Sequence, residues 1–261
     1  MLFAKPGEYE ACGIFSFEHF LLLALTIIVI RIALKNTDTS DENIIKNRIQ
    51  VVTLCAWILE VIKIIFNLAV GHGNNINTYI PLYYCSILLY AGVFSSIGKG
   101  VIKRIGDVFL AIGGIIGGVI FLILPTTSIT TYPVFHYLSI QSFLYHGAMI
   151  YLGIIINKSR YIELEEKDII YYAGLVGTMC LIAYIVNNIF DSNLMFISKD
   201  FPSNPITILY KVTGKFFPLV ISLIQMLPPF YTVMGIRKIV LGIKVMNKQV
   251  VEDEKAIYEN V

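Results

Sequence analysis

The sequence predicts an all-α membrane protein that folds as a bundle of seven transmembrane helices. Of its 261 residues, 56% are hydrophobic and only 15% are charged. A soluble domain is roughly 45–50% apolar and about a quarter charged. The apolar residues also gather in seven stretches, each near the length of about 20 residues that a helix needs to cross the bilayer core.

The seven predicted helices follow one another along the whole chain. We expect them near residues 16–34, 49–70, 78–97, 105–124, 134–156, 168–189 and 213–236. Together they make one transmembrane domain, 1–236, followed by a charged tail, 237–261. The fourth helix carries the run GGIIGG, whose small residues indicate close packing against a neighbouring helix.

The distribution of basic residues predicts the orientation in the membrane. Lys and Arg lie in or beside the first, third and fifth loops and in the tail, whereas the second loop (GHGNNIN) and the fourth (PTTSITTYP) have none. Only the sixth loop breaks the contrast, with Lys199 and Lys211. Cytoplasmic loops carry the excess of basic residues. We therefore expect a multi-pass protein of the cell membrane with its N-terminus outside and its C-terminus in the cytoplasm.

Charge and cysteine spacing exclude several function classes. A net charge of +2, with no basic patch interleaved with aromatic residues, argues against nucleic acid as a partner. The four cysteines form no CxxC pair and have no metal-ligand spacing, and no phosphate-binding or metalloprotease motif occurs. We expect neither a metal nor a cofactor. The candidates that remain are polar side chains inside apolar segments, which normally face a bundle interior or a wet cavity.

The fifth predicted helix carries one stripe of polar side chains. At 100° per residue, His136, Ser139, Ser142 and His146 fall within about a third of the helix circumference. Such a stripe suits a face that handles protons or holds a ligand. Interhelical hydrogen bonding that only holds the bundle together accounts for the same pattern.

The second predicted helix carries two opposite charges and an amide. Glu60 and Lys63 are i, i+3 neighbours that can form an ion pair, and Asn67 returns to nearly the same face as Glu60. One interpretation is a structural ion pair that locks this helix to its neighbours. The other is that Glu60 orients or charges a histidine across the bundle.

Cys85 lies in the segment YIPLYYCSI of the third predicted helix. A cysteine is nucleophilic as a thiolate, which needs a base or a positive charge nearby, and a histidine of another helix can supply one. The alternative is a small core residue. On a helix from 78, Cys85 lies about two turns nearer the outer surface than His146, so His136 is the closer partner unless the helices tilt.

Most of the candidate polar groups fall in the outer half of the predicted bundle. His19, Asn67 and Asn187 lie toward the outer ends of the first, second and sixth helices. The sixth loop, FDSNLMFISKDFPSNPIT, is long for a bundle connection, as lids often are, although a simple surface loop fits the same sequence. A site here meets the outer leaflet or the extracellular side.

Six pieces of the sequence occur in the order typical of one membrane-protein family. They are FSFEHF, LEVIK, PLYYCS, ILP, YPVFHYLSIQSFLYHG and NNIFDSNLMFISKDFPSNPITIL. With these pieces the chain resembles the bacterial YwaF-like integral membrane family, which is distantly related to eukaryotic transmembrane protein 164. The chain departs from the eukaryotic motif by having Leu82, not cysteine, directly after Pro81. It departs from several bacterial relatives by having Tyr83 where they have histidine.

The resemblance implies an intramembrane enzyme that handles acyl groups. The eukaryotic relatives are thought to move fatty acyl chains between phospholipids through a cysteine that a histidine assists. Carried over, this gives a catalytic set of Cys85, His146 and His136. The residues expected to bind substrate or support the site are His19, Glu60, Lys63, Asn67, Gln141, Ser139, Ser142 and Asn187.

The sequence therefore predicts acyl transfer or hydrolysis on a phospholipid or another lipidic substrate at the outer leaflet. A membrane lipid or lipidic ligand is the expected partner. The alternative is a non-enzymatic transporter or receptor that binds a small polar or lipidic ligand in the same pocket. An enzyme needs a nucleophile and a base within hydrogen-bond reach, whereas a transporter of the common kinds has internal repeats or helices broken at the midplane.

Overall fold

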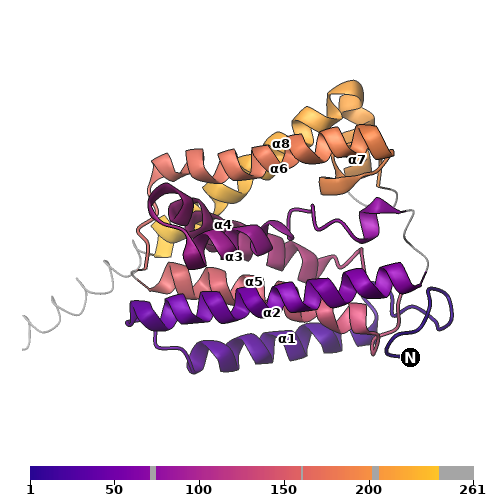
Figure 1. Cartoon of the computed structure of the whole chain (residues 1–261), viewed down its shortest axis with the longest axis horizontal. Coiled ribbons are helices and arrows are strands. Elements are labelled where there is room, and N and C mark those ends of the chain that lie inside the picture. Colours follow the sequence, from indigo (N-terminus) through magenta and orange to yellow (C-terminus); the bar gives the residue numbers. More distant parts are fainter. Residues whose placement is uncertain (71–74, 160, 202–205, 241–261) are drawn as a thin grey trace, which may run out of the picture.

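The fold is described from a computed structural model of the chain, over residues 1–70, 75–159, 161–201 and 206–240. These residues form helices, turns and loops without a strand. Figure 1 shows the long helices running side by side along the longest axis of the molecule. The α-helices are α1 (Phe17–Lys35), α2 (Glu42–Ala69), α3 (Ile87–Ile97), α4 (Gly100–Ile123), α5 (Tyr137–Lys158), α6 (Ile169–Phe190), α7 (Ile206–Thr213) and α8 (Phe217–Met226).

Within the described residues, six helical stretches are long and apolar enough to cross a membrane. They are α1, α2, α4, α5, the stretch Glu166–Phe190 and the stretch Ile206–Val240. The last includes α7, the short 3-10 turn η5 (Gly214–Phe216) and α8. The seventh helix, α3, is apolar but has only 11 residues. The all-α, multi-pass architecture is confirmed, while its orientation in a membrane stays a prediction.

The predicted start of the third helix, residue 78, is wrong. The 3-10 turn η2 (Ile76–Thr78) is followed by an irregular segment, 79–86, and α3 begins only at Ile87. Pro81 explains the difference, because proline disfavours helical backbone at the residue before it and donates no hydrogen bond. Other parts of the chain bind this backbone instead: the Tyr90 hydroxyl donates to the Pro81 carbonyl, and the amide of Met195 donates to that of Leu82.

The predicted start of the second helix, residue 49, is also wrong, because α2 begins seven residues earlier. The Asp41 carboxylate caps α2 by accepting a hydrogen bond from the amide of Asn43 at 2.8 Å. Ile45 and Ile49 are fully buried, so the first turns of α2 are amphipathic. The charged residues of these turns interrupt the hydrophobic run, so a prediction based on continuous hydrophobicity missed this part of the helix.

The helices α4 and α5 form the centre of the bundle. In their most apolar stretches 72% and 67% of the residues are buried, against 22–28% for the other candidate spans. The helices α1 and α2 pack on α5, α6 packs on α4, and α3 packs on both α2 and α4. Figure 1 shows the same order, with α1 and α2 on one side of the central pair and α6 and α8 on the other.

Glycines allow the central pair to approach closely. A Cβ added at Gly114 meets the carbonyl oxygen of Met149 at 2.8 Å, and one added at Gly118 meets the carbonyl oxygen of His146 at 2.8 Å. The GGIIGG run therefore places the backbone of α4 directly against that of α5, which confirms the close packing predicted for it.

The loops gather at two ends of the bundle, as the alternating predicted loops require. At the N-terminal end, the amide of Cys12 donates to the Tyr132 carbonyl, and the amide of Asn193 donates to the Asn77 side chain. At the opposite end, Arg104 binds the buried Asp168 carboxylate through two hydrogen bonds of 2.6 and 2.9 Å. The helix that leads into the predicted tail, 237–261, continues to Val240, and the rest of that tail lies outside the described residues.

Candidate functional site

Cys85 lies beside the middle of α5. The Tyr145 hydroxyl donates a hydrogen bond to the main-chain carbonyl of Cys85 at 3.1 Å. The cysteine as a whole is half-buried and packs against the hydrophobic core. The predicted offset of two turns between Cys85 and His146 assumed a helix from residue 78. That assumption is wrong, and the irregular segment brings Cys85 within reach of the residue next to His146.

The predicted ion pair of α2 is present next to this contact. The Lys63 ammonium lies 2.6 Å from Glu60 Oε1, and the Glu60 side chain is only 3% exposed. Within the described part of the chain, this oxygen accepts no well-aligned hydrogen bond, so the contact is an ion pair only. A buried carboxylate of this kind depends on its single cationic partner for compensation.

Lys63 connects the cysteine with the histidine of α5. Its charge interacts with both Cys85 and His146, and Glu60 interacts with Cys85 and Tyr145. These five side chains therefore share one electrostatic environment, and we refer to them as the Cys85 cluster. A positive charge beside a cysteine favours its thiolate form, which is the nucleophile, whereas burial disfavours it, so Lys63 offsets part of the effect of burial.

His146 has the hydrogen bonding expected of a base. Its Nδ1–H donates to the Ser142 carbonyl at 2.7 Å, which leaves Nε2 with a lone pair. Across the described residues, Nε2 has no hydrogen-bond partner. The ring stacks on Phe121 of α4, with centroids 3.6 Å apart and planes 6° from parallel. The backbone of α5 and the aromatic ring of α4 thus fix its orientation.

His19 uses both ring nitrogens for structure. Its Nδ1 accepts the amide of Phe15 at 3.1 Å, and its Nε2–H donates to the Leu122 carbonyl at 3.0 Å. Leu122 lies in the last turn of α4, where carbonyls have no partner within the helix. The side chain is 1% exposed and joins the beginning of α1 to the end of α4.

His136 is likewise bound through both ring nitrogens. It is the N-cap of α5, where Nδ1 accepts the amide of Leu138 at 3.1 Å, and its Nε2–H donates to the Ala4 carbonyl at 3.2 Å. The ring stacks on Tyr132, with centroids 4.0 Å apart. Burial lowers the pKa of His136 below its ordinary value of 6.5, which favours the neutral ring that both hydrogen bonds require.

The remaining predicted residues of α2 and α5 lie in different surroundings. Asn67 Nδ2 donates to the Thr78 carbonyl at 2.6 Å, which ties α2 to η2. Ser139 is fully buried, and its hydroxyl has no hydrogen-bond partner in the described residues. Gln141 is buried, and its Oε1 lies 3.5 Å from the Ser142 hydroxyl. Ser142 binds the Cys85 cluster, because its carbonyl accepts the hydrogen bond of His146 Nδ1–H.

Asn187 organises the sixth loop. Its Oδ1 accepts the amide of Leu194 and the hydroxyl of Ser192, both at 2.7 Å, and its Nδ2 donates to the Leu194 carbonyl and the Ser198 hydroxyl. The buried amide thereby replaces backbone partners that this non-helical stretch lacks.

The sixth loop packs over the segment that carries Cys85. The Phe196 ring lies against that of Tyr83, with centroids 5.1 Å apart, and the Met195 amide donates to the Leu82 carbonyl. Met195 and Phe196 have positive φ angles of 58° and 54°, which are uncommon for bulky residues. The described part of the loop at Met195 and Phe196 thus covers this segment, and movement as a lid stays a prediction.

Two residues of the site were not singled out from the sequence. Tyr145 was quoted only as part of SFLYHG, and Phe121 only as part of an apolar helix. A tyrosine beside a candidate histidine is a weak signal, because helix neighbours point in different directions. Only the path of segment 79–86 brings the Cys85 carbonyl to the Tyr145 hydroxyl.

The Cys85 cluster combines the thiol of a half-buried cysteine, an imidazole whose Nε2 has no partner among the described residues, and an ion pair whose carboxylate is buried. Such a set can form an acyl-thioester, with the thiol as nucleophile and the imidazole as base. Within the described residues, no hydrogen bond joins the Cys85 thiol to His146. Catalytic hydrogen bonds are often long in ligand-free structures and tighten when substrate is bound.

Comparison with known proteins identifies a family. The family model described as the TMEM164 family matches residues 14–234, which is most of the chain and includes the whole Cys85 cluster. No curated protein and no solved structure matches the chain.

Proposed function

The chain belongs to the TMEM164 family, and from this premise we propose that it is an intramembrane enzyme acting on lipid acyl groups. It transfers or hydrolyses an acyl group of a phospholipid or another lipidic substrate, with Cys85 as nucleophile and His146 as base. We assign it to the bacterial YwaF-like branch and take its substrate from the outer leaflet of the cell membrane.

The observation that carries the proposal is the unused nitrogen of His146. His19 and His136 each use both ring nitrogens in hydrogen bonds that hold the fold. His146 uses only Nδ1, and its Nε2 is free in the described part of the molecule. The same histidine shares the environment of Lys63 with Cys85. The proposal therefore gives the base to His146 alone and a positioning role to His136.

The reaction has two halves. In the first, His146 Nε2 takes the proton of the Cys85 thiol, and the sulfur attacks the carbonyl carbon of the lipid ester. The bond from this carbon to the ester oxygen breaks, and the imidazolium returns the proton to that oxygen, so a thioester remains on Cys85. In the second, an acceptor hydroxyl or water loses its proton to Nε2 and attacks the thioester. The carbon–sulfur bond breaks, and the thiolate recovers the proton from His146.

The neighbours of this pair support both halves. The Lys63 charge offsets part of the cost of burying the Cys85 thiolate, and Glu60, which by itself opposes the thiolate, holds Lys63 in place across 2.6 Å. The Tyr145 hydroxyl holds the cysteine's own carbonyl. Cys85 packs against the hydrophobic core, and these apolar surroundings strengthen the attraction of Lys63 while they disfavour the charged thiolate.

The experiment is site-resolved labelling of purified protein in lipid nanodiscs with a thiol-reactive lipid probe, such as an alkyl-chain iodoacetamide. We expect labelling at Cys85 to vanish in Cys85→Ser and to fall strongly in His146→Ala. Cys12→Ser is the matched control, because Cys12 is also half-buried but its thiol is hydrogen-bonded with the Ser16 hydroxyl at 3.3 Å, outside the Cys85 cluster. If His146→Ala labels Cys85 at the wild-type rate, the base assignment fails. A transporter or receptor function then becomes the better interpretation.

A further inference from the structure

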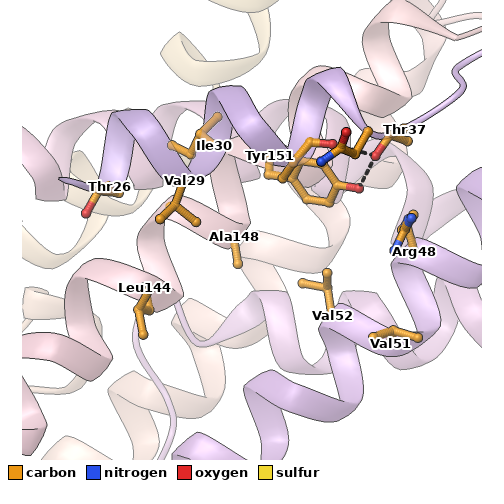
Figure 2. A pocket seen from close by; sticks show the side chains of 13 residues that line it. Thr26, Val29, Ile30, Thr37, Arg48, Val51, Val52, Leu144, Ala148 and Tyr151 are labelled. Carbon is orange, nitrogen blue, oxygen red and sulfur yellow. Dashed lines mark hydrogen bonds between the residues drawn. The ribbon is translucent and has the colours of Figure 1, made fainter. Parts of the chain in front are cut away.

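A cavity of about 480 Å³ lies between α1, α2 and α5, away from the thiol of Cys85. Its walls are mostly apolar and include Val29, Val52 and Leu144. Figure 2 shows Arg48 beside Thr37 and Tyr151 at one end of this cavity and Thr26 at the other. The volume lies within the range of about 300–1,000 Å³ that is typical of ligand sites.

A second cavity of about 190 Å³ extends the first toward the Cys85 cluster. The two share Val51, Val52, Leu144 and Ala148, and the second is lined at its far side by Tyr145. The residues that α2 contributes to both, from Arg48 to Leu59, recur at helical spacing on one face, over about 17 Å. We call the two cavities together the α1–α2–α5 groove.

The Arg48 end of the groove is polar and basic. The Thr37 and Tyr151 hydroxyls are hydrogen-bonded to each other at 2.8 Å. Arg48 is half-buried and forms no ion pair with any described residue. A guanidinium that faces an apolar groove without a carboxylate is well placed for an anionic group that arrives with a ligand.

The charges around this end also favour an anion. The basic residues near this end in the sequence are Arg31, Lys35 and Lys46, and Glu42 in the first turn of α2 is exposed. The nearest acidic residues of the connecting loop accept hydrogen bonds from the loop itself: Asp38 from Ser40, and Asp41 from the amide of Asn43. These bonds lower the pKa of Asp38 below its ordinary value, and neither carboxylate pairs with Arg48.

We propose that the α1–α2–α5 groove binds an anionic phospholipid, with its phosphate at Arg48 and one acyl chain running along the groove toward Tyr145. Basic pockets between transmembrane helices are the kind of site that holds acidic lipid head groups. The second chain lies on the outward apolar faces beside the groove, where Leu25 is 50% and Leu54 63% exposed. Those faces favour a two-chain phospholipid over a free fatty acid.

This binding does not depend on the proposed reaction. Arg48 lies about 17 Å along α2 from the level of Leu59, so the ester bonds of a lipid whose phosphate is at Arg48 lie far from the thiol of Cys85. The bound phospholipid is therefore a resident lipid of the leaflet at the first-loop end. Among the residues that line the groove, Tyr145 is the one that belongs to the Cys85 cluster, so the acyl chain contacts the cluster there.

The test is native mass spectrometry of delipidated protein titrated with dioleoyl-phosphatidylglycerol. We expect a tight one-to-one adduct with the wild type and with Cys85→Ser. Binding should weaken at least about tenfold in Arg48→Gln, because the phosphate loses its charge-assisted hydrogen bonds. Lys46→Gln is the matched control, since Lys46 is an exposed cation of the same helix that does not line the groove, and it should bind as the wild type does.

A second variant tests the groove without touching the cation. Ala148→Phe fills the part that both cavities share and should block binding while Arg48 remains. Equal binding by Arg48→Gln and Lys46→Gln overturns the proposal, as does full binding by Ala148→Phe. Displacement of phosphatidylglycerol by an equal concentration of oleate overturns the assignment to a phospholipid. Loss of binding in Cys85→Ser contradicts the separation of this site from the catalytic one.

Discussion

The Tyr145 hydroxyl lies 3.1 Å from the carbonyl oxygen of Cys85 and donates a hydrogen bond to it. This bond joins the middle of α5 to the irregular segment before α3. Because Tyr145 precedes His146 in the chain, one turn of α5 both positions the backbone of the cysteine and carries the imidazole. The bond thus makes the position of Cys85 depend on the helix that supplies its proposed base.

Tyr145→Phe removes this bond, and the carbonyl of Cys85 keeps only the hydrogen bond from the Leu88 amide at 3.1 Å. We expect the free energy of unfolding to fall by about 0.5–1.5 kcal/mol. We also expect alkylation of Cys85 by an apolar thiol reagent to slow, which mass spectrometry of the labelled peptide measures. Tyr184→Phe, at a tyrosine of α6 that is 45% exposed, is the control and should change neither quantity. Wild-type alkylation in Tyr145→Phe is the contrary result.

Lys63→Met removes the cation that pairs with Glu60 among the described residues. Because the Glu60 side chain is 3% exposed, we expect a loss of about 3–5 kcal/mol in the free energy of unfolding. Chemical denaturation in detergent measures this loss. Adding Glu60→Gln to Lys63→Met should restore part of it, since no charge is then left buried. A single variant as stable as the wild type rules out a structural need for the pair.

Gly118→Ala and Gly174→Ala should have opposite effects. A Cβ at Gly118 meets Ile150 Cγ1 at 2.5 Å and the His146 carbonyl at 2.8 Å, so α4 and α5 must move apart. Overpacking of this kind costs about 1–3 kcal/mol. A Cβ at Gly174 of α6 has nothing within 4 Å, and alanine there stabilises the helix by up to about 1 kcal/mol. Thermal unfolding temperatures that move in the same direction contradict the packing described.

Stability should fall as the pH drops below about 6.5, in part because of His136. Burial lowers the pKa of His136, so the unfolded chain takes up the proton before the folded one does. The contribution of the neutral His136 ring to stability is complete above the pKa of His136 in the unfolded chain. It is lost as the pH falls toward the lower pKa of His136 in the folded protein. His136→Asn keeps an N-cap without a titrating ring and should weaken this pH dependence. The prediction is contradicted if the unfolding temperature changes by the same amount between pH 7.5 and 5.5 in the wild type and in His136→Asn.

Composition and hydrophobic length were sufficient to predict six candidate spans, whereas the third expected helix, 78–97, contains only the 11-residue α3. The expected helix 168–189 agrees closely with α6, Ile169–Phe190, because both ends coincide with a change from apolar to polar sequence. The starts of α2 and α3 were missed for physical reasons. An amphipathic first turn around Ile45 looks like a loop on a hydrophobicity scale, and the apolar stretch after Pro81 looks like a helix although its backbone is irregular.

The site was predictable in its residue types and not in its geometry. The i, i+3 spacing of Glu60 and Lys63 is sufficient to predict their pairing, because a helix fixes it. The separation of the three described histidines into two structural ones and one with a free nitrogen depends on backbone partners far away in sequence, such as Leu122 and Ala4. No local pattern encodes those partners.

The most direct test of the account is to trap an acyl group on Cys85. Purified protein in nanodiscs of synthetic phosphatidylcholine is quenched with acid, and the peptide that carries Cys85 is weighed by mass spectrometry. The account predicts the added mass of one acyl chain on this peptide, its removal by hydroxylamine, its absence in Cys85→Ser and a much reduced amount in His146→Ala. Two results together contradict the account: Cys85 of the wild type stays unmodified, and the Cys85→Ser protein still turns over lipid.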